Sequence, residues 1–195
     1  MPEKNSVKYS NLADPRMQKA ILLIFERPCV RLRTLSALCE IPKSSIHRKL
    51  QALDYVKMLS QGGCVLEGMK VDVALFNALE NQRLYRIAVL CTKPLTLQGI
   101  ATMCGRNENS VRNSLRKLMR LGIIRKNGKL YTLNPLLQKK YSKLRTNFHK
   151  ELCRLGKILE IENLEHTIID NERVEIVIMG KKYEIHPYER LRSLL

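Results

Sequence analysis

The chain has 195 residues, of which 45% are hydrophobic and 27% are charged, and its formal net charge is +17. This length and apolar content are enough for one or two globular domains. No apolar run approaches the roughly 20 residues that a membrane-spanning helix needs, and the first ten residues lack the apolar stretch of a signal peptide. We therefore expect a cytoplasmic protein that does not enter a membrane.

The positive charge is concentrated in the larger, N-terminal part of the chain. Residues 1–157 hold 30 Lys and Arg against 10 Asp and Glu, whereas residues 158–195 hold 5 against 8. This imbalance predicts a polyanionic partner, of which nucleic acid is the first candidate. An acidic membrane surface is the second candidate, but no basic amphipathic segment has the bulky aromatic anchors that favour it.

Nothing in the sequence indicates catalysis. The six cysteines are scattered without a Cys-x-x-Cys pair, and the four histidines lie far apart, which favours reduced thiols over disulfides or a zinc site. There is no Gly-rich phosphate loop and no nucleophile motif. We expect no catalytic residue, no metal site and no cofactor, so the chain is not expected to be an enzyme. The sequence identifies no small-molecule effector.

After a polar N-terminal arm, expected to be flexible over residues 1–16, the chain repeats itself. At an offset of 65, Leu35–Cys39 aligns with Ile100–Cys104. Further upstream the offset is 66, and Ile21–Pro28 aligns with Ile87–Pro94. Few residues are identical, but the apolar positions agree, and it is these positions that specify a fold.

Both copies predict the same order of elements. An apolar helix ("MQKAILLIFERP" or "LYRIAVLCTKP") precedes a short helix, a turn and a third helix, expected near residues 44–55 and 108–121. Ser44 or Ser45 is the expected N-cap of the first of these third helices, and Asn107 or Asn109 that of the second. Alternating residues around Gly62-Gly63 and around Asn127-Gly128 then predict a β-hairpin in each copy.

This order resembles winged-helix DNA-binding domains, the group that includes the MarR, ArsR and IclR transcription factors. The stretch "LSALCEIPKSSIHRKLQAL" is most similar to the helix-turn-helix of the IclR group. The second copy resembles winged helices only in its general pattern, and its turn "GRNENS" lacks the proline of the first copy. The resemblance does not extend to an IclR effector domain, for which the chain is too short. The resemblance implies two winged-helix domains, over residues 17–70 and 71–134, with a linking helix over residues 71–86.

In winged-helix proteins the third helix lies in the DNA major groove, and the hairpin contacts the backbone or the minor groove. The resemblance therefore implies DNA contacts by the polar residues of the third helices and of the second hairpin. A merely solvated polar surface is the alternative, and the first hairpin tip, without a cation, is expected to be mainly structural. The expected DNA-binding residues are Lys43, Ser44, Ser45, His47, Arg48, Gln51, Asn109, Arg112, Asn113, Arg116, Arg120, Arg125, Lys126 and Lys129.

The remaining residues, 135–195, predict a C-terminal module. Apolar residues recur at steps of three or four from Leu137 to Leu159, which indicates a long helix, and residues 174–185 predict two strands about Gly180-Lys181. The helix either docks on the second domain or forms a dimer, and we expect a homodimer through residues 136–195. The predicted fold class is mainly α with small β-hairpin wings (α+β): two tandem winged-helix domains plus the C-terminal helix and hairpin.

Three functions agree with these features. The first is a sequence-specific, double-stranded DNA-binding transcription regulator, located in the cytoplasm at the nucleoid. The second is a plasmid or virus replication initiator or segregation protein, and the third is a tandem winged-helix protein-interaction scaffold. Residues 106–129 hold eight Lys and Arg against one acidic residue, which favours DNA over a protein partner for this region.

Overall fold

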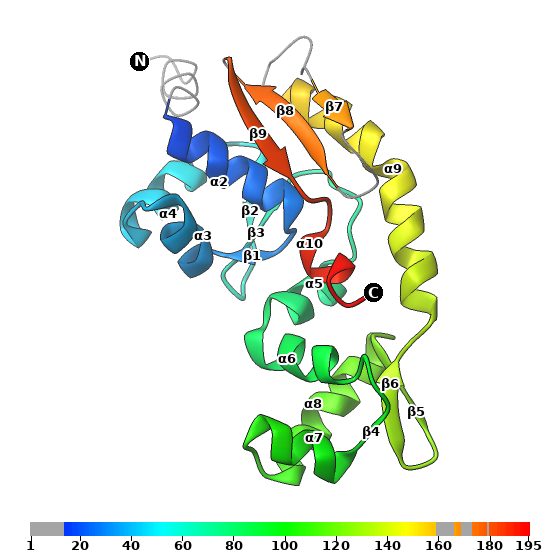
Figure 1. Cartoon of the computed structure of the whole chain (residues 1–195). Helices are drawn as coiled ribbons and strands as arrows, with labels where there is room; N and C mark the ends of the chain where they lie inside the picture. Colours follow the sequence, from blue (N-terminus) through cyan, green and yellow to red (C-terminus); the bar gives the residue numbers. More distant parts are fainter. Residues whose placement is uncertain (1–13, 159–165, 169–172, 179) are drawn as a thin grey trace. The chain divides into compact units, whose positions relative to one another are not determined.

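The computed structural model describes residues 14–158, 166–168, 173–178 and 180–195 (Figure 1). The chain forms two compact units: unit 1 comprises Met1–Val71 and Asn147–Glu189, and unit 2 comprises Asp72–Thr146 and Arg190–Leu195. The described residues are mainly helical, with small three-stranded antiparallel sheets. The predicted class, mainly α with small β-hairpins (α+β), is confirmed. No helix in these described ranges is long and apolar enough to cross a membrane.

Unit 1 begins with the elements of the first sequence copy. They are α2 (Pro15–Glu26), β1 (Val30–Arg31), α3 (Leu32–Cys39), α4 (Lys43–Gln51), β2 (Val56–Met58) and β3 (Gly63–Leu66). The strands form an antiparallel sheet in the order β1-β3-β2. Of the expected N-terminal arm, residues 1–13 lie outside the described residues, whereas residues 15 and 16 already belong to α2. The Asp14 carboxylate caps this helix by accepting a hydrogen bond from the backbone N–H of Arg16 at 3.0 Å.

Unit 2 has the same order of elements after an additional helix, α5 (Val73–Glu80). They are α6 (Gln82–Leu90), β4 (Leu95–Thr96), α7 (Leu97–Cys104), α8 (Glu108–Arg120), β5 (Ile124–Asn127) and β6 (Leu130–Leu133), with the sheet order β4-β6-β5. The two-residue strands β1 and β4 were not predicted, because two residues are too few for a pattern of alternation. Each of them adds a third strand to the hairpin of its unit.

Two helix starts differ in how the sequence specifies them. Asn107 caps α8 as predicted, and its side chain accepts a hydrogen bond from the backbone N–H of Ser110 at 2.8 Å. The predicted caps Ser44 and Ser45 of α4 are wrong, since the helix begins at Lys43 directly after Pro42, which forms no side-chain cap. The proline fixes its own φ angle ahead of the first helical residue, but it has no side-chain acceptor, so the helix begins without a side-chain cap. This helix also ends at Gln51, earlier than expected, because Leu53 turns into the core and Val56 begins β2.

The single linking helix expected over residues 71–86 is wrong. The chain is extended at Asn81 (φ −78°, ψ 108°), which ends α5 and caps α6. Its side-chain oxygen accepts hydrogen bonds from the backbone N–H groups of Arg83 (3.1 Å) and Leu84 (3.2 Å). Asparagine competes in this way with the helical hydrogen bonds of its own backbone, so an apolar pattern that continues through it does not guarantee one helix.

The C-terminal part contains the predicted long helix and strands. The helix α9 spans Leu136–Ile158, and the sheet consists of β7 (His166–Ile168), β8 (Val174–Ile178) and β9 (Lys181–Ile185), followed by α10 (Glu189–Arg192). Leu159, the expected end of the helix, lies outside the described residues. Residues 135–195 do not form a unit of their own, because the two units divide them. In unit 2, for example, the hydroxyl groups of Tyr85 and Ser193 share a hydrogen bond of 2.9 Å.

In unit 1 the C-terminal part completes the core of the first copy. The Phe148 ring lies 5.0 Å from the Phe25 ring and 5.7 Å from the Tyr188 ring, measured between centroids. Strand β9 lies beside α2 (Figure 1), and the backbone N–H of His186 donates to the Glu26 carboxylate at 2.7 Å. Strand β9, His186 and Tyr188 of the C-terminal part therefore pack on the N-terminal copy.

This packing bears on the expected homodimer. The prediction assumed that the apolar stripe of the C-terminal helix needs a second chain to cover it. Phe148, Leu152 and Leu155 are only 4%, 1% and 1% exposed within a single chain. The homodimer through residues 136–195 stays a prediction, but this stripe no longer supports it.

Candidate functional site

Helix α8 of unit 2 separates an apolar face from a polar one. Val111, Leu115 and Leu118 are 1%, 0% and 0% exposed and close the core of the unit. The expected DNA-binding residues of this helix are all exposed and follow the helical period on the opposite face: Asn109, Arg112, Asn113, Arg116 and Arg120. A helix of 13 residues is about 20 Å long. The exposed face is therefore a row of guanidinium and amide groups over several turns.

The charge of this face is almost uncompensated. The Arg112 guanidinium lies 3.9 Å from the Glu108 carboxylate, and both side chains are nearly half exposed. Water therefore screens this ion pair, and it contributes little to stability. Arg116 and Arg120 make no ion pair with any residue that the structure describes. These guanidinium groups are consequently available to an anionic partner.

The β5–β6 hairpin adds three more exposed cations, Arg125, Lys126 and Lys129. Asn127 pairs with Leu130, which leaves Gly128-Lys129 as the two-residue loop. Gly128 has a φ of +58°, the left-handed conformation that such a tight loop requires and that glycine adopts without strain. The Lys126 ammonium lies 5.7 Å from the centre of the Tyr131 ring, so this lysine also contacts its own sheet.

In unit 1 the expected residues of α4 are divided. Lys43, Ser44 and His47 border an open hollow of about 680 Å³, together with Arg31, Arg33 and the hairpin tip at residues 60–62. The remaining three lie elsewhere on the helix: Arg48 and Gln51 are exposed outside this border, and Ser45 is half-buried. The structure thus brings half of the residues predicted for the first copy together with the hairpin.

Arg31 and Arg33 were missed in the sequence, because the DNA contacts were predicted only on the third helices and the second hairpin. Arg31 lies in the two-residue strand β1, and Arg33 lies in the first turn of α3. Strand β1 pairs with β3, and the backbone N–H of Leu32 donates to the Gly62 carbonyl at 3.1 Å. This pairing holds both arginines beside the hairpin tip. The first hairpin has no cation of its own at the tip, but these two residues supply positive charge next to it.

Lys49, also on α4, is engaged within unit 1. Its ammonium group donates to the Asp14 carboxylate at 2.9 Å and so ties α4 to the start of α2. Burial acts to raise the pKa of Asp14, but the hydrogen bonds from Lys49 and Arg16 outweigh it and lower this pKa to about 2. The Asp14 carboxylate is consequently ionised at neutral pH, and its ion pair with Lys49 stabilises the fold of unit 1.

No group of three His, Cys, Asp or Glu within the described ranges could hold a metal ion. Comparison with known proteins finds no family model and no curated protein that matches the chain. The function is therefore inferred from the chemistry of the exposed side chains.

Proposed function

We propose that this chain binds double-stranded DNA through the exposed face of α8 and the β5–β6 hairpin, with α4 and its adjoining hollow as a second contact. The observation that supports this most directly is the composition of α8. One face is fully buried, whereas the opposite face presents Arg112, Arg116 and Arg120 together with two asparagines, Asn109 and Asn113. A phosphate backbone and the edges of bases are the partners that match this combination.

The dimensions and the side-chain types support DNA over a protein partner. The major groove of B-DNA, about 12 Å wide, admits an α-helix. Arginine donates two hydrogen bonds to guanine, and asparagine pairs with adenine in the same bidentate way. Protein–protein interfaces are enriched in arginine but depleted of lysine, and their centres hold few charges overall. A scaffold that binds proteins has no comparable reason to place eight Lys and Arg against one acidic residue over residues 106–129.

The order of elements in both units supports a winged-helix mode of binding, in which α4 and α8 are the recognition helices. The similarity of residues 35–53 to IclR-type helix-turn-helix segments supports a role in transcription regulation. A replication initiator or segregation protein is the competing role for the same DNA-binding surface. Where the bound sites lie in the genome distinguishes these roles.

The experiment is selection of bound sequences from random duplex DNA by the full chain, followed by footprinting on the native sites. We expect enrichment of one sequence pattern, protected best at low salt, at promoters. Protection of repeated elements at an origin instead identifies an initiator. Failure to enrich any sequence, combined with binding that does not change with salt, refutes DNA recognition by this surface. An inverted repeat indicates a two-fold symmetric homodimer.

A further inference from the structure

Unit 2 contains a second concentration of arginines, outside the polar face of α8. A hollow of about 290 Å³ lies between α6, the α7–α8 turn and α8, and we call it the arginine hollow. Three arginines border it, Arg83 and Arg86 from α6 and Arg106 from the turn, together with Ser110 and Ser114 of α8. No Asp or Glu is among the residues that line it.

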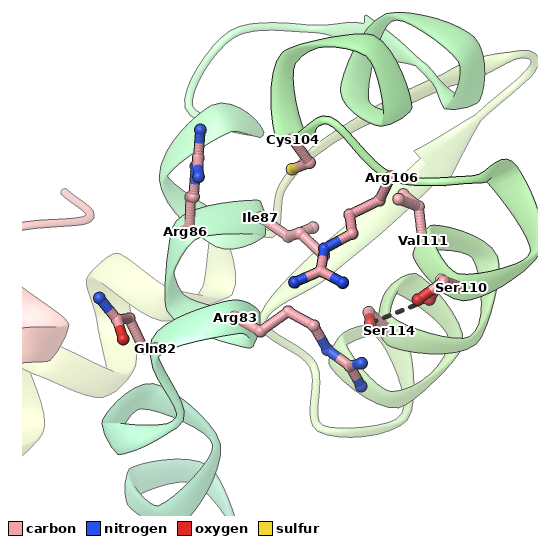
Figure 2. Close-up of a pocket in the computed structure, with 9 residues that line it drawn as sticks. All are labelled: Gln82, Arg83, Arg86, Ile87, Cys104, Arg106, Ser110, Val111 and Ser114. Atoms are coloured by element: carbon pink, nitrogen blue, oxygen red, sulfur yellow. Dashed lines mark hydrogen bonds between the residues drawn. The ribbon is translucent and has the colours of Figure 1, made fainter.

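Two of these arginines are directed into the same space. Figure 2 shows the guanidinium groups of Arg83 and Arg106 in the space between α6 and α8 that Ser110 and Ser114 border. Within the ranges that the structure describes, neither guanidinium pairs with a carboxylate. Arg86 is held differently, because its guanidinium donates to the Met103 carbonyl at 3.2 Å. The hollow therefore has two guanidinium groups of like charge and a third close by.

Unit 1 shows that the fold does not require these arginines. At the offset of 66, Met17 and Ala20 correspond to Arg83 and Arg86, and both are 0% exposed. At the offset of 65, Ile41, which is 4% exposed, corresponds to Arg106. In the first copy the same place is thus filled by apolar side chains.

The serine side of the hollow differs in the same way. Lys49 corresponds to Ser114 at the offset of 65, and its charge is neutralised by Asp14 at 2.9 Å. Ser114 is 2% exposed, and its hydroxyl donates to the Ser110 carbonyl at 3.1 Å. Unit 1 therefore contains an internal ion pair where unit 2 has a small hydroxyl and open space.

We propose that the arginine hollow binds a phosphate group between the guanidinium groups of Arg83 and Arg106. Arginine donates parallel hydrogen bonds to two oxygens of a phosphate, and such bonds are about twice as strong as neutral ones. An anion also relieves the repulsion between like charges that lack a carboxylate partner. The volume suffices, because a phosphate group has the bulk of a few water molecules, at about 30 Å³ each.

The phosphate has two conceivable sources, a phosphodiester of the DNA backbone or a free phosphate group. On a helix with about 100° between residues, Ser110 lies roughly a third of a turn from Arg116, whereas the buried Ser114 lies nearly half a turn away. The Ser110 side of the hollow is therefore the side that a duplex bound to α8 would approach. The DNA source rests on the proposed function, whereas a free phosphate does not.

The test titrates inorganic phosphate into the full chain at constant ionic strength and follows the backbone amide signals of Arg106 and Ser110 by NMR. The variant is Arg83→Met with Arg106→Ile, which installs the residues that unit 1 has at the corresponding positions. Lys139→Ala removes one exposed charge of unit 2 away from the hollow and is the matched control. Arg106→Ala alone is a second variant, in case the double exchange disturbs folding.

We expect saturable phosphate binding by the wild type and the control, and affinity at least about tenfold lower in the variants. No saturable shift in the wild type, or equal affinity in wild type and variants, overturns the site. The source follows from binding of the selected duplex. If the bound phosphate belongs to the DNA backbone, the variants also lose affinity for the duplex. Inorganic phosphate then displaces the duplex more strongly than chloride does at the same ionic strength. If the variants bind the duplex as tightly as the wild type, the ligand of the hollow is a free phosphate group. If the wild type binds phosphate but no duplex, only the proposed DNA function is refuted.

Discussion

The sharpest prediction concerns how α8 and the β5–β6 hairpin contribute to the salt dependence and the sequence dependence of DNA affinity. Six of the exposed cations on these two elements are expected DNA contacts: Arg112, Arg116, Arg120, Arg125, Lys126 and Lys129. Each neutralised phosphate contributes about −0.9 to the slope of log K against log[salt]. If all six reach phosphates, the slope is about −5, and affinity falls about a thousandfold between 50 and 200 mM salt.

Two single substitutions separate contacts to phosphates from contacts to bases. Lys129→Ala removes an exposed ammonium at the hairpin loop, so we expect a slope smaller by about 0.9 and equal weakening on every sequence. Arg116→Ala removes a guanidinium from the middle of the α8 face. It should weaken the selected site by about 1–3 kcal/mol and leave other sequences nearly unchanged.

The assay is fluorescence anisotropy with the selected duplex and a scrambled duplex at four or more salt concentrations. Lys139→Ala is the control, since it removes one exposed charge of unit 2 from α9 and should leave the sequence preference unchanged. If Arg116→Ala weakens both duplexes equally, α8 binds the backbone without contacting bases. If neither variant differs from the control, the exposed face of α8 is not the DNA-binding surface.

Three further predictions concern stability, measured as the free energy of unfolding in denaturant. Asp14→Asn keeps a helix cap but removes the ion pair with Lys49, which costs at most about 1 kcal/mol because solvent reaches both groups. Since the folded-state pKa of Asp14 is lowered to about 2, its stabilisation is present above about pH 4 and lost as pH falls to 2, so wild type and variant should converge there. Phe148→Ala should cost about 3–5 kcal/mol, because the ring contacts Phe25 and Tyr188, and a cost under about 1 kcal/mol contradicts that packing. Gly128→Ala should cost about 1–2 kcal/mol from its φ of +58° alone, because an added Cβ meets nothing within 4 Å; an unchanged stability means that the loop adopts another turn.

The features predictable from sequence were those encoded in local periodicity. The apolar stripe of Val111, Leu115 and Leu118 was sufficient to place α8, and Asn107, one of the two N-caps predicted for it, begins the helix. The long C-terminal helix could be predicted equally well from its apolar period. The residues that cover its apolar face could not be predicted, because the partners of Phe148 lie far away in sequence, at Phe25 and Tyr188. A helical pattern shows that a face must be covered but does not show by what.

The candidate site divides in the same way. Residues on a regular helix face could be predicted from spacing, and all five of those on α8 are exposed. Arg31 and Arg33 could not be predicted from spacing, because it is the pairing of β1 with β3 that places them beside the hairpin. A signal for Arg83 and Arg106 did exist in the repeat. They are arginines where the aligned copy has Met17 and Ile41, and charge at a position that the other copy fills with apolar atoms indicates a role beyond folding.

The two copies therefore keep one pattern of apolar positions and differ in their charges. In unit 1 the α4 charge of Lys49 is neutralised by Asp14, and the place of the arginine hollow is filled by Met17, Ala20 and Ile41. In unit 2 the uncharged Ser114 corresponds to Lys49, and Arg83 and Arg106 border open space at the positions of Met17 and Ile41. Because uncompensated charge is what raises affinity for a polyanion, unit 2 should dominate binding to DNA. In unit 1 only Arg31, Arg33 and Lys43 border the hollow beside α4, and Arg48 is exposed elsewhere on this helix, so substitutions there should lower the affinity for DNA less than substitutions on α8.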